Sequence, residues 1–217
     1  MSFESDVQPV KYLIGTSGLL EWAMASWREV EPDTVLHPID IGQDRDYRFD
    51  LSTLLDVRAD AATAFVTWGP QFLNFRRLEL MSEIKSRGFK MPALICKGVL
   101  LASGISVGEN CLIGAGSIIG SDCKIGFKSV IGAGCILGSA TQVASSAWIS
   151  DGVQIAGQAN IGANATLCRG VMLDEGVNIG KQVLLDRPGR YFKSILDKTF
   201  LLPRFNEPVK IIDYRNT

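Results

Sequence analysis

The chain has 217 residues, with 22 basic against 23 acidic side chains and a single histidine, His37. A composition of 47% hydrophobic and 21% charged residues is that of a globular protein, and the near-zero net charge argues against general binding to nucleic acid or to a membrane surface. One histidine excludes metal sites built from several histidines of one chain, so we expect no metal.

The lack of a recognisable targeting signal and the pattern of cysteines indicate the compartment. The first residues carry Glu4 and Asp6 and lack the apolar core of a secretory signal, and no stretch approaches the ~20 apolar residues of a membrane span. The five cysteines are odd in number and form no CxxC pair, which disfavours disulfides and thiolate zinc sites. We therefore expect a cytoplasmic protein.

Residues 1–93 alternate predicted strands with helices, which favours a small Rossmann-like parallel α/β domain. An apolar strand over 10–14 leads into the turn Gly15-Thr16-Ser17-Gly18 and a helix over 19–30. We then predict strands over 34–41 and 64–67, a short helix over 50–55, and a helix over 71–87 that ends at Gly88.

Residues 95–190 repeat every six residues. All sixteen hexads open with Ile, Leu or Val, eight openers are followed by glycine, and the fifth residue is small or β-branched almost throughout. This period fits neither a helix nor a hairpin. It favours short strands joined by corners, where glycine tolerates unusual dihedrals. We predict a parallel β-solenoid over 94–190 of about five coils, in which residues 18 apart stack and the opener and fifth residue point inward.

The same register assigns positions to the cysteines. Cys111, Cys123 and Cys135 take the inward fifth position on three different walls, so we expect them to be small buried side chains. Cys96 and Cys168 take the position that glycine often occupies, and we expect them to be structural as well.

Residues 191–217 are too apolar to form a free tail, because they include Tyr191-Phe192, the segment 200–203 and the segment 209–212. We predict a C-terminal helix from about Tyr191 that packs on the solenoid or on a neighbouring molecule, followed by a short extended segment.

The hexad array resembles the left-handed parallel β-helix of the hexapeptide-repeat acyltransferases, and the handedness is implied by that resemblance alone. The N-terminal turn, with Gly15 and Gly18, and the link Gly88-Phe-Lys-Met-Pro92 resemble the sialic-acid and bacillosamine acetyltransferase group. The resemblance implies a homotrimer with acyl-CoA between adjacent prisms. It also implies a nucleotide-linked sugar held by Gly15, Thr16, Ser17 and Gly18, whose backbone N–H groups would face a diphosphate.

The resemblance also implies where the chemistry occurs. The general base of the family is a histidine in a turn of the β-helix, and the hexads align that position with Ser145. A second histidine of the family aligns with Gln154, and the glycine whose N–H steadies the acetyl carbonyl aligns with Ala163. A serine cannot act as a general base near pH 7. His37 lies outside the repeats, and we expect it to be a surface residue.

Three interpretations follow from the missing histidine. The acceptor can be an amine, which is a better nucleophile than an alcohol and needs only a weak base. Another side chain can serve, and Asp151 is the nearest, although its stacking with Arg169 and Arg187 equally fits a surface charge row. The third interpretation is an inactive homologue that binds a nucleotide sugar or a partner protein.

The sequence and the resemblance together favour an acyl-CoA-dependent acyltransferase of surface-polysaccharide synthesis. We expect acetyl-CoA as co-substrate and a nucleotide-linked amino sugar as acceptor, with N-acetylation as the reaction. The positive charges that could meet the CoA phosphates are Lys181, Arg187, Arg190 and Lys193, and solvated surface is the alternative for each of them.

Overall fold

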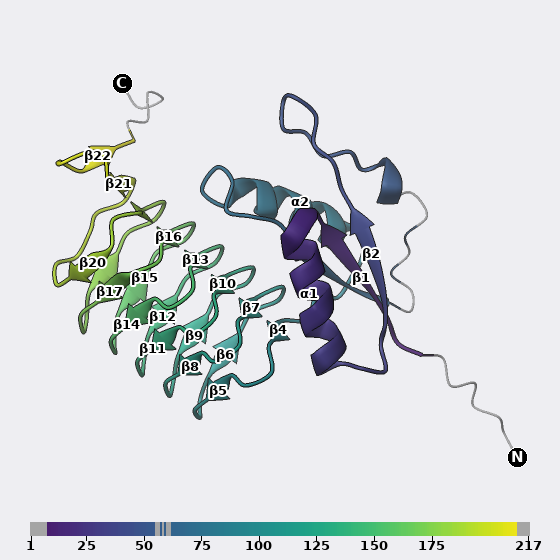
Figure 1. Ribbon diagram of the computed structural model, residues 1–217, viewed down its shortest axis with the longest axis horizontal. Coiled ribbons are helices and arrows are strands. Elements are labelled where there is room, and N and C mark those ends of the chain that lie inside the picture. Colours follow the sequence, from purple (N-terminus) through teal and green to yellow (C-terminus); the bar gives the residue numbers. More distant parts are fainter. Residues whose placement is uncertain (1–7, 55–56, 58, 60–61, 212–217) are drawn as a thin grey trace, which may run out of the picture.

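The computed structural model describes residues 8–54, 57, 59 and 62–211 (Figure 1). A small α/β unit covers one end of a stack of short strands. The α/β unit consists of β1 (Val10–Gly15), α1 (Ser17–Val30), β2 (Val35–Asp40), the 3-10 turn η1 (Ser52–Leu54), β3 (Ala62–Thr67) and α2 (Phe75–Ser86). Its strands are parallel in the order β2-β1-β3. The prediction of a small parallel α/β unit followed by a parallel β-solenoid is confirmed.

Two N-terminal elements differ from their predicted bounds. The helix expected over 71–87 begins at Phe75, because Phe72, Leu73 and Asn74 adopt left-handed φ angles of 48°, 53° and 66°. The short helix expected over 50–55 is the 3-10 turn η1, and residue 55 lies outside the described residues. Gly88 follows α2 with φ +88°, as expected of a helix-terminating glycine.

The solenoid has three walls of parallel strands, which we name by their outer surfaces. The covered wall contains β4 (Leu94–Ile95), β7 (Leu112–Ile113), β10 (Val130–Ile131), β13 (Trp148–Ile149), β16 (Thr166–Leu167) and β19 (Leu184–Leu185). The apolar wall contains β5 (Leu100–Leu101), β8 (Ile118–Ile119), β11 (Ile136–Leu137), β14 (Gln154–Ile155), β17 (Val171–Leu173) and β20 (Gly189–Tyr191). The polar wall contains β6 (Ser106–Val107), β9 (Lys124–Ile125), β12 (Gln142–Val143), β15 (Asn160–Ile161) and β18 (Asn178–Ile179).

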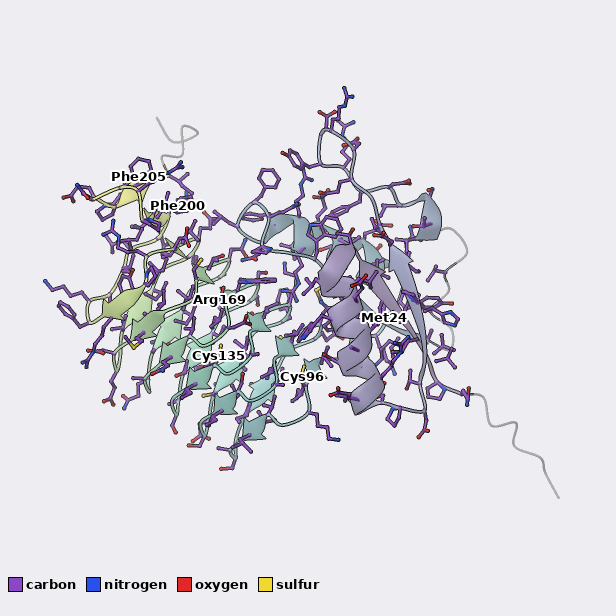
Figure 2. All side chains as sticks on the ribbon, in the orientation of Figure 1. Met24, Cys96, Cys135, Arg169, Phe200 and Phe205 are labelled. Atoms are coloured by element: carbon purple, nitrogen blue, oxygen red, sulfur yellow. The ribbon has the colours of Figure 1, made fainter. Side chains whose placement is uncertain are left out.

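The predicted stacking is confirmed on all three walls. Val130 pairs with Trp148, Ile136 with Gln154 and Gln142 with Asn160, each at a step of 18 residues. The interior is a column of hexad openers and fifth residues. Cys111, Cys123 and Cys135 are fully buried in it on three walls, as predicted. Figure 2 labels Cys135 among the central coils.

The glycines that follow the hexad openers have a different cause from the one we expected. At Gly126, a Cβ would lie 2.6 Å from the backbone nitrogen of Ser145 in the next coil, so glycine is required by close approach between coils. The left-handed dihedrals occur two residues later in the hexad, for example at Lys128 with φ +62°. Glycine therefore provides space at one corner position, while its conformational freedom matters at another.

The prediction of a helix from about Tyr191 is wrong, and the solenoid continues beyond Arg190. Tyr191 and Ile195 pack against the solenoid core, and β21 (Thr199–Leu201) adds to the covered wall beside β19, so the stack has about six coils. The last strand, β22 (Val209–Lys210), pairs antiparallel to β21 (Figure 1). Ile195 follows Tyr191 by a step of four residues instead of six, which conceals the repeat in the sequence. Apolar side chains of the tail cover the open end of the core.

The α/β unit packs on the covered wall through an apolar cluster. Leu20, Ala23 and Trp27 of α1 are buried with Leu112 and Val130 of the wall. Figure 2 places Met24 of α1 and Cys96 of the first coil on this side of the molecule. The cluster orients the carboxyl ends of β1 and β3 toward the solenoid coils that follow.

Two buried polar side chains fix the same joint. The Asn110 amide accepts a hydrogen bond from the Val66 N–H (2.7 Å) and donates one to the Val66 carbonyl (3.0 Å), so it pairs with the free edge of β3. The buried Arg77 guanidinium of α2 donates to the backbone carbonyls of Asn110 (3.1 Å) and Lys128. These bonds set how the α/β unit sits on the solenoid.

Replacing Asn110 with glycine tests this joint, because glycine keeps the φ of +52° while it removes the amide. We expect the free energy of unfolding to fall by about 2–4 kcal/mol, since two buried backbone groups lose their partners. Urea unfolding followed by circular dichroism measures the change. The matched control is Asn164→Gly, at the same corner position with φ +59°. Equal losses in both variants would contradict the role of Asn110.

Candidate functional site

Three of the predicted site residues share one corner of the solenoid, between the polar and the covered walls. We call it the serine corner, and it comprises Glu109–Asn110, Phe127–Lys128, Ser145–Ser146, Ala163–Asn164 and Lys181–Gln182. The Asn164 N–H donates to the Ser145 carbonyl (3.2 Å), and the Gln182 N–H donates to the Ala163 carbonyl (2.9 Å). Ser145, Ala163 and Lys181 therefore form one column along the solenoid axis.

Asp151 lies on a second corner, between the covered and the apolar walls, together with Ala133, Arg169 and Arg187; we call it the arginine corner. One Asp151 carboxylate oxygen accepts the Ala133 N–H (3.0 Å), and the other pairs with Arg169 (2.6 Å). Both oxygens are therefore engaged within the described structure. This arrangement suits a fixed negative charge better than a mobile proton acceptor.

The residues expected to meet CoA phosphates are dispersed. Arg187 donates to the carbonyls of Leu202 (3.2 Å) and Phe205, so it holds the C-terminal segment against the solenoid. Arg190, on the apolar wall, pairs with Asp174 at 2.6 Å. Lys181 and Lys193 are exposed, on the serine corner and in the C-terminal segment respectively. The structure of a single chain does not gather these four residues into one phosphate site.

Gln154 lies on the apolar wall and is exposed, in register with Met172 and Arg190. The whole width of the covered wall separates this position from the serine corner. Within one chain, Ser145 and Gln154 are therefore on different faces, and only a second chain could bring copies of the two positions together.

The Gly15–Gly18 turn connects β1 to α1 at the carboxyl edge of the parallel sheet. The helices that follow β1 and β3 pack on opposite faces of the sheet, and in open α/β sheets ligands bind in the crevice between the carboxyl ends of two such strands. Gly15 has a packing cause, because its Cβ would lie 1.9 Å from Thr67 Oγ1. A Cβ at Gly18 would meet nothing within 4 Å, which leaves the backbone there accessible.

A cavity of about 390 Å³ connects this edge to the arginine corner. Leu19 and Trp22 of α1 face Trp148 of the covered wall, and Asp151 and Arg169 complete the lining. Arg169, labelled in Figure 2, follows β16 in the later coils of the solenoid. The structure thus brings Asp151 close to the first turn of α1. The two tryptophans were not identified from sequence, because their presence in one cavity depends on how the two parts pack.

Lys128 on the serine corner is the second feature that sequence alone missed. Its side chain is fully buried, and its Nζ has no hydrogen-bond partner among the described residues. Burial, together with the neighbouring Arg77 guanidinium, lowers the pKa of Lys128 to about 7. A lysine at a hexad position where Asn110 and Asn164 stand in other coils was the one available signal in the sequence.

The cysteines do not offer nucleophiles at this site. Burial raises the pKa of Cys111, and it raises the pKa of Cys135 to about 11. Burial, with Asp186 nearby, raises the pKa of Cys168 to about 12. These thiols stay protonated at neutral pH, whereas reactive cysteines have a lowered pKa.

Other chemistries find little support in the part of the chain that the structure describes. No cluster of three or more His, Cys, Asp and Glu side chains there could hold a metal ion. His37 is exposed on the edge strand β2 beside Tyr12, with ring centroids 5.5 Å apart, and is remote from the repeats. None of the helices in residues 8–54, 57, 59 and 62–211 has the length and apolarity to cross a membrane.

Lys128 should make the stability of the protein depend on pH. The folded chain releases this proton near pH 7 and the unfolded chain near the ordinary lysine pKa of 10.5, so the unfolded state holds more protons between these two pH values. The contribution of Lys128 to the free energy of unfolding therefore rises with pH between about pH 7 and 10.5, by at most about 1.4 kcal/mol per pH unit. In Lys128→Met this rise should be absent. Urea unfolding of both proteins at several pH values measures the difference, and parallel curves would contradict the burial of a neutral amine.

The comparisons agree with the solenoid. The family model described as "Hexapeptide repeat of succinyl-transferase" matches residues 104–139. No curated protein matches the chain. A mutant of perosamine N-acetyltransferase from Caulobacter crescentus, in complex with CoA and GDP-perosamine, superposes with a TM-score of 0.74 at 19% identity, covering 94% of this chain and 97% of that one.

Two further structures have the same fold. PerB from Caulobacter crescentus, in complex with CoA and GDP-perosamine, has a TM-score of 0.66 at 22% identity and covers 88% of this chain and 92% of that one. The acetyltransferase domain of PglB from Neisseria gonorrhoeae has a TM-score of 0.60 at 16% identity and covers 93% of this chain and 99% of that one. The chain therefore carries hexapeptide repeats and has the fold of these acetyltransferases over nearly its whole length.

Proposed function

We propose that the chain is an acetyl-CoA-dependent N-acetyltransferase that acts on a nucleotide-linked amino sugar in the cytoplasm, in the synthesis of surface polysaccharide. The proposal depends on where the carboxyl edge of the sheet lies relative to the solenoid. The carboxyl edge of the parallel sheet, with its Gly15–Gly18 turn, opens onto the solenoid coils that follow its docking site. A nucleotide-binding edge is thereby joined to a hexapeptide-repeat surface.

The matched structures support both substrates of this proposal. The perosamine N-acetyltransferase and PerB were solved with CoA and a GDP-linked amino sugar bound, and the PglB domain was also solved with acetyl coenzyme A. An amine acceptor is consistent with a serine at position 145, because a neutral amine attacks a thioester without the strong base that an alcohol requires. We propose that residues 1–93 bind the nucleotide sugar and that the solenoid, which starts at 94 and continues past Arg190 into the C-terminal segment, carries catalysis.

We further propose a homotrimer with its active sites between subunits. Ser145 and Ala163 on the serine corner of one chain would then meet Gln154 on the apolar wall of the next. The apolar wall supports this arrangement. Its outward side chains form an exposed stripe at 18-residue steps that one chain leaves uncovered. The members of the stripe are Leu100 (63% exposed), Ile118 (44%), Ile136 (43%) and Met172 (40%).

An assay with purified protein tests the activity. We expect release of free CoA thiol, and a product heavier by one acetyl group in mass spectrometry, with at least one member of a panel of UDP-, dTDP- and GDP-linked amino sugars. The matching sugars with a hydroxyl in place of the amine serve as controls and should not react. An absence of thiol release with every sugar, together with no acetyl-CoA binding by calorimetry, would leave only the inactive binding protein.

Charges on the apolar wall test the assembly. Ile118→Glu with Ile136→Glu should convert a trimer to monomers in light scattering and abolish acetyl transfer, while circular dichroism stays unchanged. Lys124→Glu with Gln142→Glu is the matched control, because these residues take the same hexad position on the polar wall. The control should remain trimeric and active. A monomeric wild-type protein, or a trimer that survives the Ile118 and Ile136 changes, would contradict the proposed interface.

A further inference from the structure

The last coil forms the end of the solenoid that lies away from the α/β unit (Figure 1). Its two most prominent side chains, Phe192 (69% exposed) and Leu196 (71% exposed), are the most exposed large apolar residues in the described part of the chain. The terminal repeats of a solenoid need a polar outer face to keep the protein soluble. An end that exposes apolar side chains therefore indicates a surface that meets a partner.

Both side chains stand at the hexad position that glycine takes in earlier coils. Leu196 occupies the position of Gly180, because the residues that precede them pair with each other. A Cβ at Gly180 would lie 2.4 Å from a backbone nitrogen of the next coil. Phe192 occupies the position of Gly138 on the apolar wall, where the corresponding distance is also 2.4 Å. Side chains at this position point along the solenoid axis, and after the last described coil they extend outward from the end.

Basic side chains surround these apolar ones. A hollow of about 450 Å³ at the end is lined by residues of the last coil and by Lys210 of β22. The Arg204 guanidinium carbon lies 5.1 Å from the centroid of the Phe205 ring, and Figure 2 shows Phe205 at the end of the solenoid away from the α/β unit. We call this surface the terminal face, and its members are Phe192, Lys193, Leu196, Arg204, Phe205 and Lys210.

The near-zero net charge of the chain conceals a cationic end. Residues 190–211 carry five basic and two acidic side chains, whereas the whole chain has 22 basic against 23 acidic ones. One of the two acids, Asp197, accepts a backbone N–H of the preceding coil at 2.8 Å. Lys193, Arg204 and Lys210 are exposed and form no salt bridge within the described structure. The terminal face therefore offers three cations to a partner.

An anionic lipid bilayer fits this composition better than a protein does. The centres of protein–protein interfaces are depleted of lysine, whereas basic residues beside aromatic and aliphatic ones are typical of surfaces that bind anionic bilayers. Phe192 beside Lys193 and Phe205 beside Arg204 provide such pairs, with 5.8 Å between the Lys193 Nζ and the Phe192 ring centroid. A second copy of the same end would bring like charges together.

We propose that the terminal face binds the chain to anionic lipid bilayers. Phe192 and Leu196 enter the headgroup region, while Lys193, Arg204 and Lys210 meet the lipid phosphates. A single small face of this kind binds weakly and reversibly. In the trimer proposed above, prisms packed side by side about a parallel threefold axis would present three terminal faces in one plane, so the three would bind together.

This orientation is compatible with the proposed function, although it does not depend on it. The α/β unit lies at the opposite end of the solenoid, so a chain bound through its terminal face keeps the Gly15–Gly18 turn open to the aqueous phase (Figure 1).

Vesicle sedimentation with the full-length protein tests the proposal. The vesicles contain either phosphatidylcholine alone or phosphatidylcholine with one-third phosphatidylglycerol. We expect binding to the anionic vesicles in low salt, and binding that is weaker by about tenfold or more on neutral vesicles. High salt should reduce binding to the anionic vesicles in the same way, because it screens the cations.

Two variants separate the apolar from the cationic contribution. Phe192→Ser with Leu196→Ser, and separately Arg204→Ser with Lys210→Ser, should each weaken vesicle binding by about tenfold. Circular dichroism and light scattering should show an unchanged fold and assembly.

Each variant has a matched control. Val30→Ser with Val35→Ser removes two exposed apolar side chains from the α/β unit, and Lys97→Ser with Lys124→Ser removes two exposed lysines from earlier coils. Both controls should bind vesicles like wild type.

Four outcomes would overturn the proposal. The first is a lack of preference for anionic vesicles, and the second is an equal loss in variants and controls. The third is end-to-end association in light scattering that Phe192→Ser with Leu196→Ser abolishes, which would assign the face to a second copy. The fourth is a loss of acetyl-CoA affinity in that variant by calorimetry, which would assign the face to the co-substrate. Acetyl transfer without vesicle binding would overturn this inference and uphold the proposed function, whereas vesicle binding without acetyl transfer would do the reverse.

Discussion

The structure depends on backbone pairing between successive coils. The Gly126 N–H donates to the Val143 carbonyl at 2.7 Å, and equivalent bonds recur along every wall. This pairing requires each coil to repeat the path of the one before it, so each hexad position keeps its environment throughout the stack. Columns of side chains at 18-residue steps follow, and the walls acquire different surfaces because each column is independent of the other two.

The same constraint determines how a site can be built. Ser145, Ala163 and Lys181 align because they share one column, whereas Gln154 belongs to another wall and cannot approach them within a chain. The backbone pairing holds the three walls in fixed positions, so one wall cannot move onto another. A site that combines Ser145 with Gln154 would therefore have to form between chains, and in the proposed trimer the uncovered stripe on the apolar wall would supply the contact surface.

The α/β unit adds a parallel-sheet edge to the solenoid, and at this edge we propose that backbone N–H groups bind a phosphate. Its position depends on the Asn110 amide and the Arg77 guanidinium, both of which bond to backbone atoms across the joint. These hydrogen bonds are buried and therefore shielded from water. They also place the Arg77 guanidinium, which has no carboxylate partner among the described residues, beside Lys128. The electrostatics of the serine corner are therefore a consequence of the docking, since the solenoid alone would leave this amine in water.

The sequence by itself determined the solenoid, the stacking step, the inward residues and the alternation of strands and helices, because these depend on local spacing and on pairing at a constant period. The prediction from sequence was wrong at the tail, because the step from Tyr191 to Ile195 is four residues instead of six. It was also wrong about the cause of the hexad glycines, which is close approach between coils and not dihedral freedom. Only the tertiary structure decided the burial of Lys128 and the placement of Trp22 and Trp148 in the lining of one cavity. Arg77 and Lys128 are 51 residues apart in sequence, and such an environment arises from packing that no local pattern records.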